Sequence, residues 1–396
     1  MKILSVNAGS SSLKFQMYEM PEEKVLISGY VERIGLDGGF WNVKVSGKKI
    51  KTEGNLANHS EAVKVLIDEL FKNEIIKSLD EIDGIGHRVL HGGEKYSDSV
   101  IITDEVIQDI KNLTKLGPLH HPGNLAGIEA LKEVMPNTPM VAVFDTAFHQ
   151  TMPEKNYMYP VPQEWYKEHK VRKYGFHGTS HKYITQTMQQ MLNKENVNLI
   201  ICHIGSGASI SAIKEGKCYN TTMGLTPLDG LMMGTRCGAI DPSIIEYVCR
   251  ETNKSVEEIT NDLNKKSGLL GVAGFSDCRD IENAVIEGNE TAILAYNMYC
   301  DRIAKYIAEY YLDLEGNVDA IVFTAGVGEN GFMVRESVIN KLNPIGISID
   351  KEVNNSIASF KDIKEGKISD NNSKVEVYVV PTDEEVVIAR DVCSLI

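Results

Sequence analysis

The sequence predicts an α/β fold built from two related domains, and three observations support this class. A strand, a Gly/Ser-rich tip and a second strand occupy residues 3–18, and the same arrangement returns at residues 198–213. Strand-like apolar runs alternate with segments of helical periodicity along the chain. A further strand at residues 320–324 leads through a glycine-rich loop into a helix. Two short hairpins can also resemble each other by chance, so the duplication is a hypothesis.

Composition limits the classes of partner. A chain of 396 residues has room for about two or three domains. Its 41 Lys and Arg against 55 Asp and Glu give a net charge of −14, which disfavours nucleic acid and anionic membrane as general partners. Any phosphate must therefore be bound by a few local cations.

The cysteines and the N-terminus indicate a compartment. Seven cysteines without a CxxC pair cannot form a complete set of internal disulfides, which favours a reducing environment. Met1 and Lys2 are followed by no secretory apolar segment, and no apolar run approaches the roughly 18–20 residues of a spanning helix. We expect a soluble, cytoplasmic protein.

The first hairpin is a candidate phosphate site. Residues 3–6 form an apolar strand, residues 7–12 read Asn-Ala-Gly-Ser-Ser-Ser, and apolar residues alternate with polar ones from Leu13 to Tyr18. The tip offers backbone N–H groups, hydroxyls, an amide and Lys14, which together suit a phosphate. An ordinary surface turn is the alternative interpretation.

The rest of the first half alternates strands and helices, with two notable strand ends. We expect strands at residues 25–34, 41–50, 82–90 and 140–144, and helices beginning near Ser60 and covering 106–116 and 125–134, with a loop at 117–124 between the last two. Arg88 lies near the end of one strand and Asp145 follows another. A carboxylate there is either a site residue or a helix N-cap.

The second half begins after prolines at 153, 160 and 162, which are typical of a linker. His177 and His181 directly precede a helix predicted at 182–192, and their spacing of four residues suits a zinc pair. No HExxH motif and no third ligand accompany them, which disfavours zinc.

Beyond the second hairpin, Arg236 lies in a tight loop of small residues. We expect residues 255–263 and 280–312 to be largely helical, a helix from Phe332 after the loop 325–330, a last strand at 375–380 and a short helix after Glu385. Neither the GxGxxG nor the GxxxxGK[ST] fingerprint occurs.

Polar side chains gather at the predicted strand ends and glycine loops. They are Asn7, Ser10, Ser12, Lys14, Arg88, His120, Asp145, His177, Arg236 and Glu384. Oxygen ligands without a Cys/His cage suit Mg²⁺, and two arginines with a histidine suit a phosphoryl group in transfer. Each residue taken alone is as well explained by a solvated surface or a structural ion pair.

Several motifs resemble the signatures of the acetate kinase family. Residues 5–14 resemble its first signature and 87–94 its second; further matches in order are 118–124, 144–149, 175–178, 233–236, 324–330 and 381–385. The resemblance implies two duplicated actin-like ATPase domains of the ribonuclease H-like fold with a nucleotide cleft between them. It places the domains at 1–150 plus 385–396, the acyl and phosphoryl side, and at 151–384, the nucleotide side.

The resemblance also implies an activity and a set of roles. The activity is reversible transfer of a phosphoryl group between ATP and acetate, with Mg²⁺ (Mn²⁺ as a substitute) and ADP and acetyl phosphate as products, in a homodimer. The catalytic residues implied are Arg88, Asp145, His120, His177 and Arg236, and the metal residues are Asn7, Asp145 and Glu384. The nucleotide residues implied are Ser10, Ser12, Lys14, His203, Gly205, Ser206, Gly207, Asp277, Cys278, Arg279, Gly326, Val327, Gly328, Glu329 and Asn330. The acyl pocket implied is Leu90, Leu119, Phe176 and Pro227.

Some positions depart from the family pattern. Ser206 replaces an asparagine, Cys278 replaces an aromatic residue and Ala239 replaces an acidic or amide residue, which bears on purine preference. Leu90 replaces a valine, and His121 and Gly123 are also atypical. Alternatives are a propionate kinase, a kinase using GTP or pyrophosphate, and an actin-like or chaperone-like nucleotide switch. A nicotinamide dehydrogenase built on residues 326–328 lacks the third glycine of its fingerprint.

Overall fold

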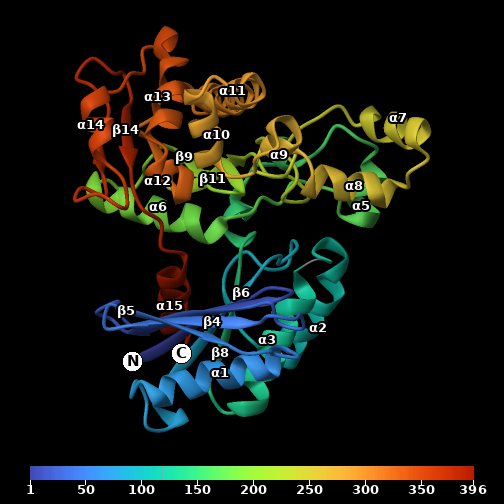
Figure 1. Cartoon of the computed structure of the whole chain (residues 1–396), viewed down its shortest axis with the longest axis vertical. Helices are drawn as coiled ribbons and strands as arrows, with labels where there is room; N and C mark the ends of the chain where they lie inside the picture. Colours follow the sequence, from blue (N-terminus) through green and yellow to red (C-terminus); the bar gives the residue numbers. More distant parts are fainter. Residues whose placement is uncertain (119) are drawn as a thin grey trace. The chain divides into compact units, whose positions relative to one another are not determined.

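A computed structural model describes residues 1–118 and 120–396 (Figure 1). The chain divides into two compact units. Unit 1 comprises Met1–Gln150 and Asp383–Ile396, and unit 2 comprises Thr151–Thr382. Each unit has its own β-sheet, and the last helix of the chain returns to unit 1. No helix in the described ranges is both long enough and apolar enough to cross a membrane.

Unit 1 is organised around an eight-stranded mixed sheet in the order β5-β4-β3-β2-β1-β6-β8-β7. Its strands are β1 (Lys2–Ala8), β2 (Ser12–Glu19), β3 (Lys24–Glu32), β4 (Phe40–Val45), β5 (Lys48–Glu53), β6 (Gly84–Val89), β7 (Val100–Ile101) and β8 (Met140–Phe144). The predicted first hairpin is confirmed, with Ala8 opposite Leu13 at its tip. Parallel pairing of β1, β6 and β8 brings the ends of these strands to one edge of the sheet.

Unit 2 contains a six-stranded sheet in the order β11-β10-β9-β12-β14-β13. Its strands are β9 (Leu199–Ile204), β10 (Ala208–Lys214), β11 (Lys217–Thr221), β12 (Ala320–Thr324), β13 (Gly366–Lys367) and β14 (Glu376–Val379). The second predicted hairpin, β9–β10, is therefore also present, with Ala208 opposite Ile204.

The two sheets share one five-stranded arrangement. In unit 1, β3-β2-β1 are antiparallel neighbours, and β6 and β8 continue parallel to β1. In unit 2, β11-β10-β9 are antiparallel neighbours, and β12 and β14 continue parallel to β9. The strand order and the directions correspond throughout. This supports the predicted duplication far better than the likeness of two hairpins could.

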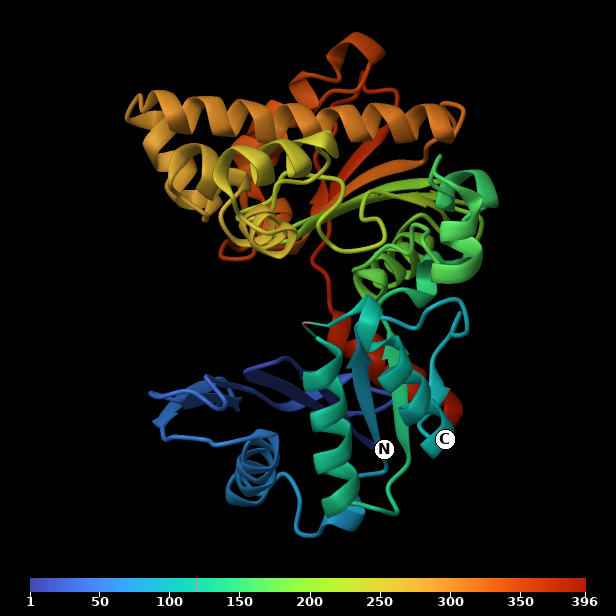
Figure 2. The same cartoon turned by 90° about the vertical axis from the view of Figure 1, so that its right-hand side faces the viewer.

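Helices cover the sheets of both units (Figures 1 and 2). Unit 1 has α1 (His59–Lys72), α2 (Asp104–Asn112), α3 (His121–Val134) and α15 (Glu384–Leu395). Unit 2 has α4 (Glu154–Tyr157), α5 (Gln163–His169), α6 (Gly178–Met191), α7 (Ser243–Thr252), α8 (Val256–Lys265), α9 (Gly268–Ala273), α10 (Cys278–Ile286), α11 (Glu290–Asp313), α12 (Ala325–Asn330), α13 (Phe332–Asn340) and α14 (Lys351–Ser356).

Alternation along the strands decides which helix each side chain meets. On one face, Leu4 and Val6 join the apolar core beneath α1, while a Cβ on Gly127 of α3 would touch Ala8. On the other face, β6 lies so close to α15 that a Cβ on Gly86 would be 2.2 Å from Ile388 Cγ2. Arg88, two residues after Gly86, points to this same face. The sheet thus directs Arg88 toward the start of α15.

One predicted strand is divided, and two predicted helical regions are confirmed with local detail added. Helix α1 begins at His59, near Ser60 as predicted, and its N-cap is Asn58, whose side chain accepts the Glu61 N–H. Residues 41–50 are two strands joined by a turn at Ser46 and Gly47, both with positive φ. Residues 280–312 are largely helical as predicted, in two helices, because α10 ends at Ile286 and Asn289 caps α11.

Two predicted loops also contain helical turns. Helix α3 begins at His121, inside the predicted loop 117–124, because Pro122 is compatible with the first turn of a helix. Residues 325–330 form the short helix α12 directly after β12, in place of an open glycine loop. Ala325 opens α12 at φ 64°, a left-handed conformation that is costly for a non-glycine residue.

Candidate active site

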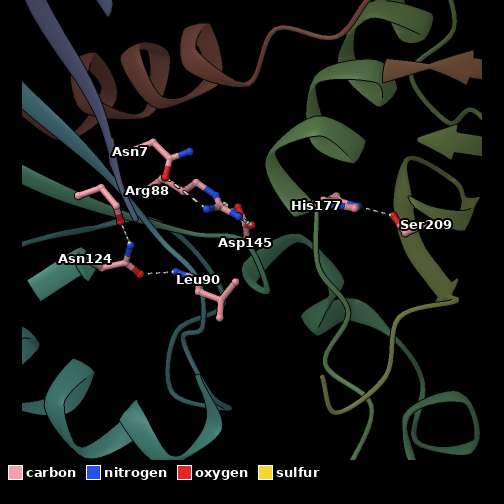
Figure 3. Close-up of polar contacts among 8 residues, drawn as sticks. Asn7, Arg88, Leu90, Asn124, Asp145, His177 and Ser209 are labelled. Carbon is pink, nitrogen blue, oxygen red and sulfur yellow. Dashed lines mark hydrogen bonds and ion pairs between the residues drawn. The ribbon is translucent and has the colours of Figure 1, made fainter. Parts of the chain in front are cut away.

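The centre of unit 1 is an ion pair between Arg88 and Asp145 (Figure 3). Arg88 Nε donates to Asp145 Oδ2 at 3.1 Å, and Nη2 donates to the same oxygen. Arg88 Nη1 donates to Asn7 Oδ1 at 3.3 Å. The three side chains come from the ends of β6, β8 and β1, which the parallel pairing places side by side. Asp145 is therefore a partner of Arg88, and the N-cap interpretation is wrong.

Burial strongly affects the charges of this group. Asp145 is fully buried, and burial raises the pKa of its carboxyl, with the Arg88 charge opposing that shift. Burial acts against the charge of Arg88, but the Asp145 carboxylate outweighs it and raises the pKa of the guanidinium, helped by Glu384 and Glu385. Glu384 also acts to raise the pKa of Asp145, and His120 acts to lower it. The structure therefore brings four predicted residues, Arg88, Asp145, Glu384 and His120, into one electrostatic group.

This group has the donors that a hard cation needs. Oδ1 of Asp145 is buried and has no hydrogen-bond partner, and a buried carboxylate oxygen without a partner is costly unless a ligand completes it. Within residues 1–118 and 120–396, no cluster of three His, Cys, Asp or Glu could enclose a metal. Mg²⁺ commonly binds through one or two carboxylates and retained waters. Asn7, Asp145 and Glu384 fit such an ion.

Asn124 fixes the phosphate hairpin of unit 1 (Figure 3). Its Nδ2 donates to the Ala8 carbonyl at 2.6 Å, and its Oδ1 accepts the Leu90 N–H at 3.1 Å. The atypical Gly123 next to it has a steric reason, because a Cβ there would lie 2.3 Å from the Gly9 carbonyl oxygen. Helix α3 therefore sits directly against the tip that carries Ser10, Ser12 and Lys14.

The predicted acyl residues are distributed over both units. Leu90 is 4% exposed in unit 1, next to the Arg88 strand end. In unit 2, Phe176 is buried, and the carbonyl of Pro227 accepts a hydrogen bond from Arg236 Nη1 at 3.0 Å. Leu119 lies outside the described residues.

Unit 2 contains a network of histidines and hydroxyls around His177. His177 Nδ1 and His181 Nε2 both bond to Ser209 Oγ, at 2.9 and 2.8 Å. The ring of His203 stacks on that of His177 with centroids 4.2 Å apart. His177 has φ 57°, a left-handed conformation at the start of α6. Both histidines of the supposed zinc pair therefore bind one serine hydroxyl, which orients the His177 ring.

A cavity of about 760 Å³ lies within unit 2. One part of its wall is polar and narrow: the β9–β10 tip at Gly205, Ser206 and Gly207 meets the loop of Arg236, where Gly234 N–H donates to the Ser206 carbonyl at 3.2 Å. Burial lowers the pKa of Arg236, which has no carboxylate partner within the described residues. A partly buried cation without a carboxylate partner, beside a glycine-rich tip, suits an anionic ligand.

The remaining wall of this cavity comes from the later helices. Its lining residues are Leu269, Ser276, Asp277, Cys278, Arg279, Glu282, Asn283, Tyr299, Gly326, Val327, Asn330, Gly331, Phe332 and Phe360, together with Thr235 of the arginine loop. Most of the nucleotide residues predicted in unit 2 thus meet at one cavity, namely Gly205, Ser206, Gly207, Asp277, Cys278, Arg279, Gly326, Val327 and Asn330. The predicted residues Ser10, Ser12 and Lys14 belong to unit 1 and do not line it. Its volume is within the usual range of small-molecule and cofactor sites.

Three predicted nucleotide residues have other contacts. His203 does not line the cavity; its Nδ1 bonds to Ser180 Oγ at 2.7 Å. The carbonyls of Gly328 and Glu329 accept hydrogen bonds from Nη1 of the fully buried Arg335, both at 2.8 Å. These three residues therefore lie outside the lining of the cavity, and Arg335 holds α12 in place.

Several residues of the site were not predicted from the sequence. Ser209, Asn124 and Glu282 are polar residues within strands or helices, and neither spacing nor composition distinguishes them there. Oε1 of Glu282 is buried without a partner, although the residue lines the cavity. For Asn124, a signal existed in the sequence: it follows a His-Pro-Gly run that opens a helix.

Fold and site together define a class: an α/β enzyme with two units of one sheet topology, equipped for phosphate chemistry. The comparisons agree. The sequence model of the Acetokinase family matches residues 2–390. An acetate kinase of Bacillus cytotoxicus is 53% identical to this chain, and the match covers 100% of this chain and 98% of the relative. An acetate kinase of Bacillus subtilis is 52% identical, and the match covers 100% of this chain and 99% of the relative.

Solved structures are similar over the whole length. The acetate kinase of Porphyromonas gingivalis has a TM-score of 0.93 and 45% identity, covering 100% of this chain and 99% of its own. A propionate kinase of Francisella tularensis has a TM-score of 0.94 and 41% identity, with both chains fully covered at 100%. The chain belongs to the acetokinase family. The predicted family, fold class and enzyme class, a kinase, are confirmed.

Proposed function

We propose that this protein is an acetate kinase that catalyses reversible phosphoryl transfer between ATP and acetate, giving ADP and acetyl phosphate. The observation that carries the proposal is the cavity of about 760 Å³ with Arg236 in its wall, which suits a nucleotide whose phosphates reach the glycine tip and the arginine. The relatives that share about half of its residues over the full chain are named acetate kinases, which supports acetate as the acceptor.

The chemistry is a direct in-line displacement. A carboxylate oxygen of acetate forms a bond to the γ-phosphorus of ATP, the bond from that phosphorus to the bridging oxygen breaks, and ADP leaves with the bonding electrons. No proton needs to be moved, because the attacking carboxylate is already ionised. Catalysis then depends on position and on charge stabilisation at the transferring group.

The proposed roles in this step fall on residues of each unit. In unit 1, Arg88 binds the acetate carboxylate and the transferring phosphoryl group, with His120 in support, and Ser10, Ser12 and Lys14 line the phosphate hairpin. In unit 2, Arg236 stabilises charge on the phosphoryl oxygens. Neutral His177 donates a hydrogen bond to the phosphoryl group from Nε2 when its Nδ1 accepts the Ser209 hydroxyl hydrogen.

The domain expected from the sequence at 1–150 plus 385–396 is the proposed acyl and phosphoryl side. The domain expected at 151–384 is the proposed nucleotide side. Asn7, Asp145 and Glu384 would hold Mg²⁺, largely through water, and Mn²⁺ would substitute. When bound, the ion neutralises phosphate charge. The residues supply the oxygen atoms that such an ion and its waters would need, among them Oδ1 of Asp145, which has no hydrogen-bond partner.

A hydroxamate assay on the purified protein tests the proposal. We expect acetyl phosphate to form from ATP and acetate only when Mg²⁺ is present, and ATP to form in the reverse direction. Absence of acetyl phosphate at saturating substrates would refute the proposed function. Nucleotide turnover that proceeds equally well without any carboxylic acid would instead indicate a nucleotide-driven switch.

A second candidate is a propionate kinase, because a structure of that name matches the whole chain with a TM-score of 0.94. The acyl pocket distinguishes the two, and Leu90 favours the smaller acid since it is one methylene larger than valine. Parallel assays with acetate and propionate, and with ATP, GTP and pyrophosphate as donors, separate these activities.

We further propose a cytoplasmic homodimer. Helix α7 has no buried residue, and Ile244 and Tyr247 are 40% and 58% exposed on it, with Val256 of α8 at 58%. Exposed apolar residues gathered on adjacent helices are typical of an interface between subunits. All seven cysteines are free thiols, which suits a reducing compartment. Sedimentation equilibrium should give twice the mass of the 43.9 kDa chain.

A further inference from the structure

Phe360 is an unusually exposed aromatic residue in the wall of the unit 2 cavity. It is 70% exposed and belongs to the segment between α14 and β13, far in sequence from the other lining residues. A phenylalanine ring left in water loses the stabilisation that burial provides. Its place in a cavity wall suggests that a ligand covers it.

The segment that carries Phe360 is held against the cavity. Ser359 donates from its backbone N–H and from Oγ to Asn330 Oδ1, at 2.9 and 2.7 Å. Asn330 ends α12, so the aromatic segment is tied to the glycine-containing helix of the same cavity. The Ala358 N–H donates to the Ile363 carbonyl at 3.1 Å, which closes the segment into a tight loop.

Lys361 further fixes the ring. Its Nζ donates to the carbonyl of Asn355 and lies 5.2 Å from the Phe332 ring centroid and 5.8 Å from that of Phe360. One ammonium group therefore contacts two cavity-lining rings and the end of α14. The position of Phe360 is thus determined by contacts on both sides of it in the sequence.

The neighbouring groups of the same cavity offer little to a nucleobase. On α10, Cys278 has a small buried thiol, which provides no flat surface for a base. Glu282 Oε1 is buried, so it presents no acceptor to the cavity. A nucleobase of any kind can stack on an exposed aromatic face, and Phe360 provides one.

We propose that Phe360 is the residue on which the nucleobase of the bound nucleotide stacks. This inference rests on the proposed function for the identity of the ligand. It assigns the phosphates to the Gly205–Gly207 tip and Arg236, and the base to the part of the cavity formed by α10, α13 and the Phe360 loop. Phe360 therefore determines affinity for the nucleoside portion and not for the phosphates.

The test compares a ligand that has a base with one that lacks it. Titration calorimetry with ADP and with inorganic pyrophosphate is performed on the wild-type protein, Phe360→Ala and the control Phe71→Ala, an exposed phenylalanine of α1 in unit 1. We expect Phe360→Ala to weaken ADP binding roughly 5- to 150-fold, the range for loss of a base–aromatic stack. Pyrophosphate binding should not change, and Phe71→Ala should bind both as wild type.

A second variant tests proximity directly. Phe360→Trp adds an indole at the site, and its emission should respond to ADP but not to pyrophosphate, beyond any response of the wild-type protein. Unchanged ADP affinity in Phe360→Ala, or equal loss for both ligands, would overturn the inference. The hydroxamate assay is read separately: normal acetyl phosphate formation with unchanged ADP affinity refutes only the role of Phe360. Failure of the wild-type enzyme to form acetyl phosphate refutes only the function.

Discussion

Arg88 directs two hydrogen bonds to the same carboxylate oxygen, Oδ2 of Asp145, and leaves Oδ1 of that buried carboxylate without a partner. The pair is thus asymmetric: one oxygen is occupied by the arginine, and the other is available to a ligand. Burial raises the pKa of Asp145, and the Arg88 charge opposes that shift. The two residues therefore depend on each other for both charge and position.

Replacing Arg88 should affect activity and stability together. Arg88→Ala removes transition-state charge stabilisation, so we expect kcat to fall by about 10²-fold or more. It also leaves Asp145 buried without its cation, so the free energy of unfolding should fall by about 3 kcal/mol. Kinetics and urea denaturation measure the two effects. Near wild-type turnover would remove Arg88 from the proposed mechanism.

Arg236 offers a matched comparison, because its Nη1 donates to a carbonyl and it has no carboxylate partner within the described residues. Arg236→Ala should lower kcat by about 10²-fold or more while leaving the urea midpoint near the wild-type value, since removing this partly buried cation leaves no carboxylate unpaired. A clear loss of stability in this variant would mean that Arg236 is mainly structural.

Much of the fold could be predicted from the sequence, because hydrophobic periodicity and turn residues are local signals. Both hairpins and the strand ends of Arg88 and Asp145 followed from such patterns. Helix starts were less predictable: Asn58 and Ser60 are both good caps, and Pro122 suits a loop as well as a first helical turn. The tertiary structure decided between them.

The site was partly predictable for a different reason. The resemblance to a family identified the residues in its motifs, but it could not show which of them line the cavity. His203, which the resemblance assigns to the nucleotide, does not line the cavity and stacks on His177. Ser209 meets His177 only because β10 passes beside the start of α6, and Phe360 lies in a segment without periodicity. Such contacts depend on the three-dimensional arrangement.

Leu90 should determine the preference for the acyl substrate. We expect the wild-type kcat/KM to favour acetate over propionate, and Leu90→Val to reduce that margin by roughly 5- to 150-fold, the effect of about one methylene in an apolar pocket. The paired assay with both acids measures this. A wild-type preference for propionate would reverse the assignment of the acyl substrate.

His87 should make folding stability depend on pH. It is buried, and burial lowers its pKa to about 3, whereas in the unfolded chain the pKa is about 6.5. Below pH 6.5 the unfolded state binds a proton that the native state excludes, so stability falls as the pH decreases from about 6.5 toward 3. This group alone should cost about 2 kcal/mol between pH 7 and pH 5.

Urea denaturation across this pH range tests the role of His87. His87→Met should lose this part of the slope, while His169→Gln, which changes an exposed histidine, should retain it. Equal slopes in the wild type and His87→Met would contradict the prediction.

The side-chain amide of Asn124 links two parts of unit 1 for which different substrates are proposed. One end binds the Ala8 carbonyl at the phosphate hairpin, and the other binds the backbone of Leu90 beside the proposed acyl pocket. Two kinds of substitution could therefore broaden the range of acids that this enzyme accepts, and they differ in their effect on the hydrogen bonds of Asn124. Changes to the Leu90 side chain leave the amide bridge intact. Changes to the first turn of α3 would alter acid selection and phosphate binding at once, so a gain in one would be expected to cost the other.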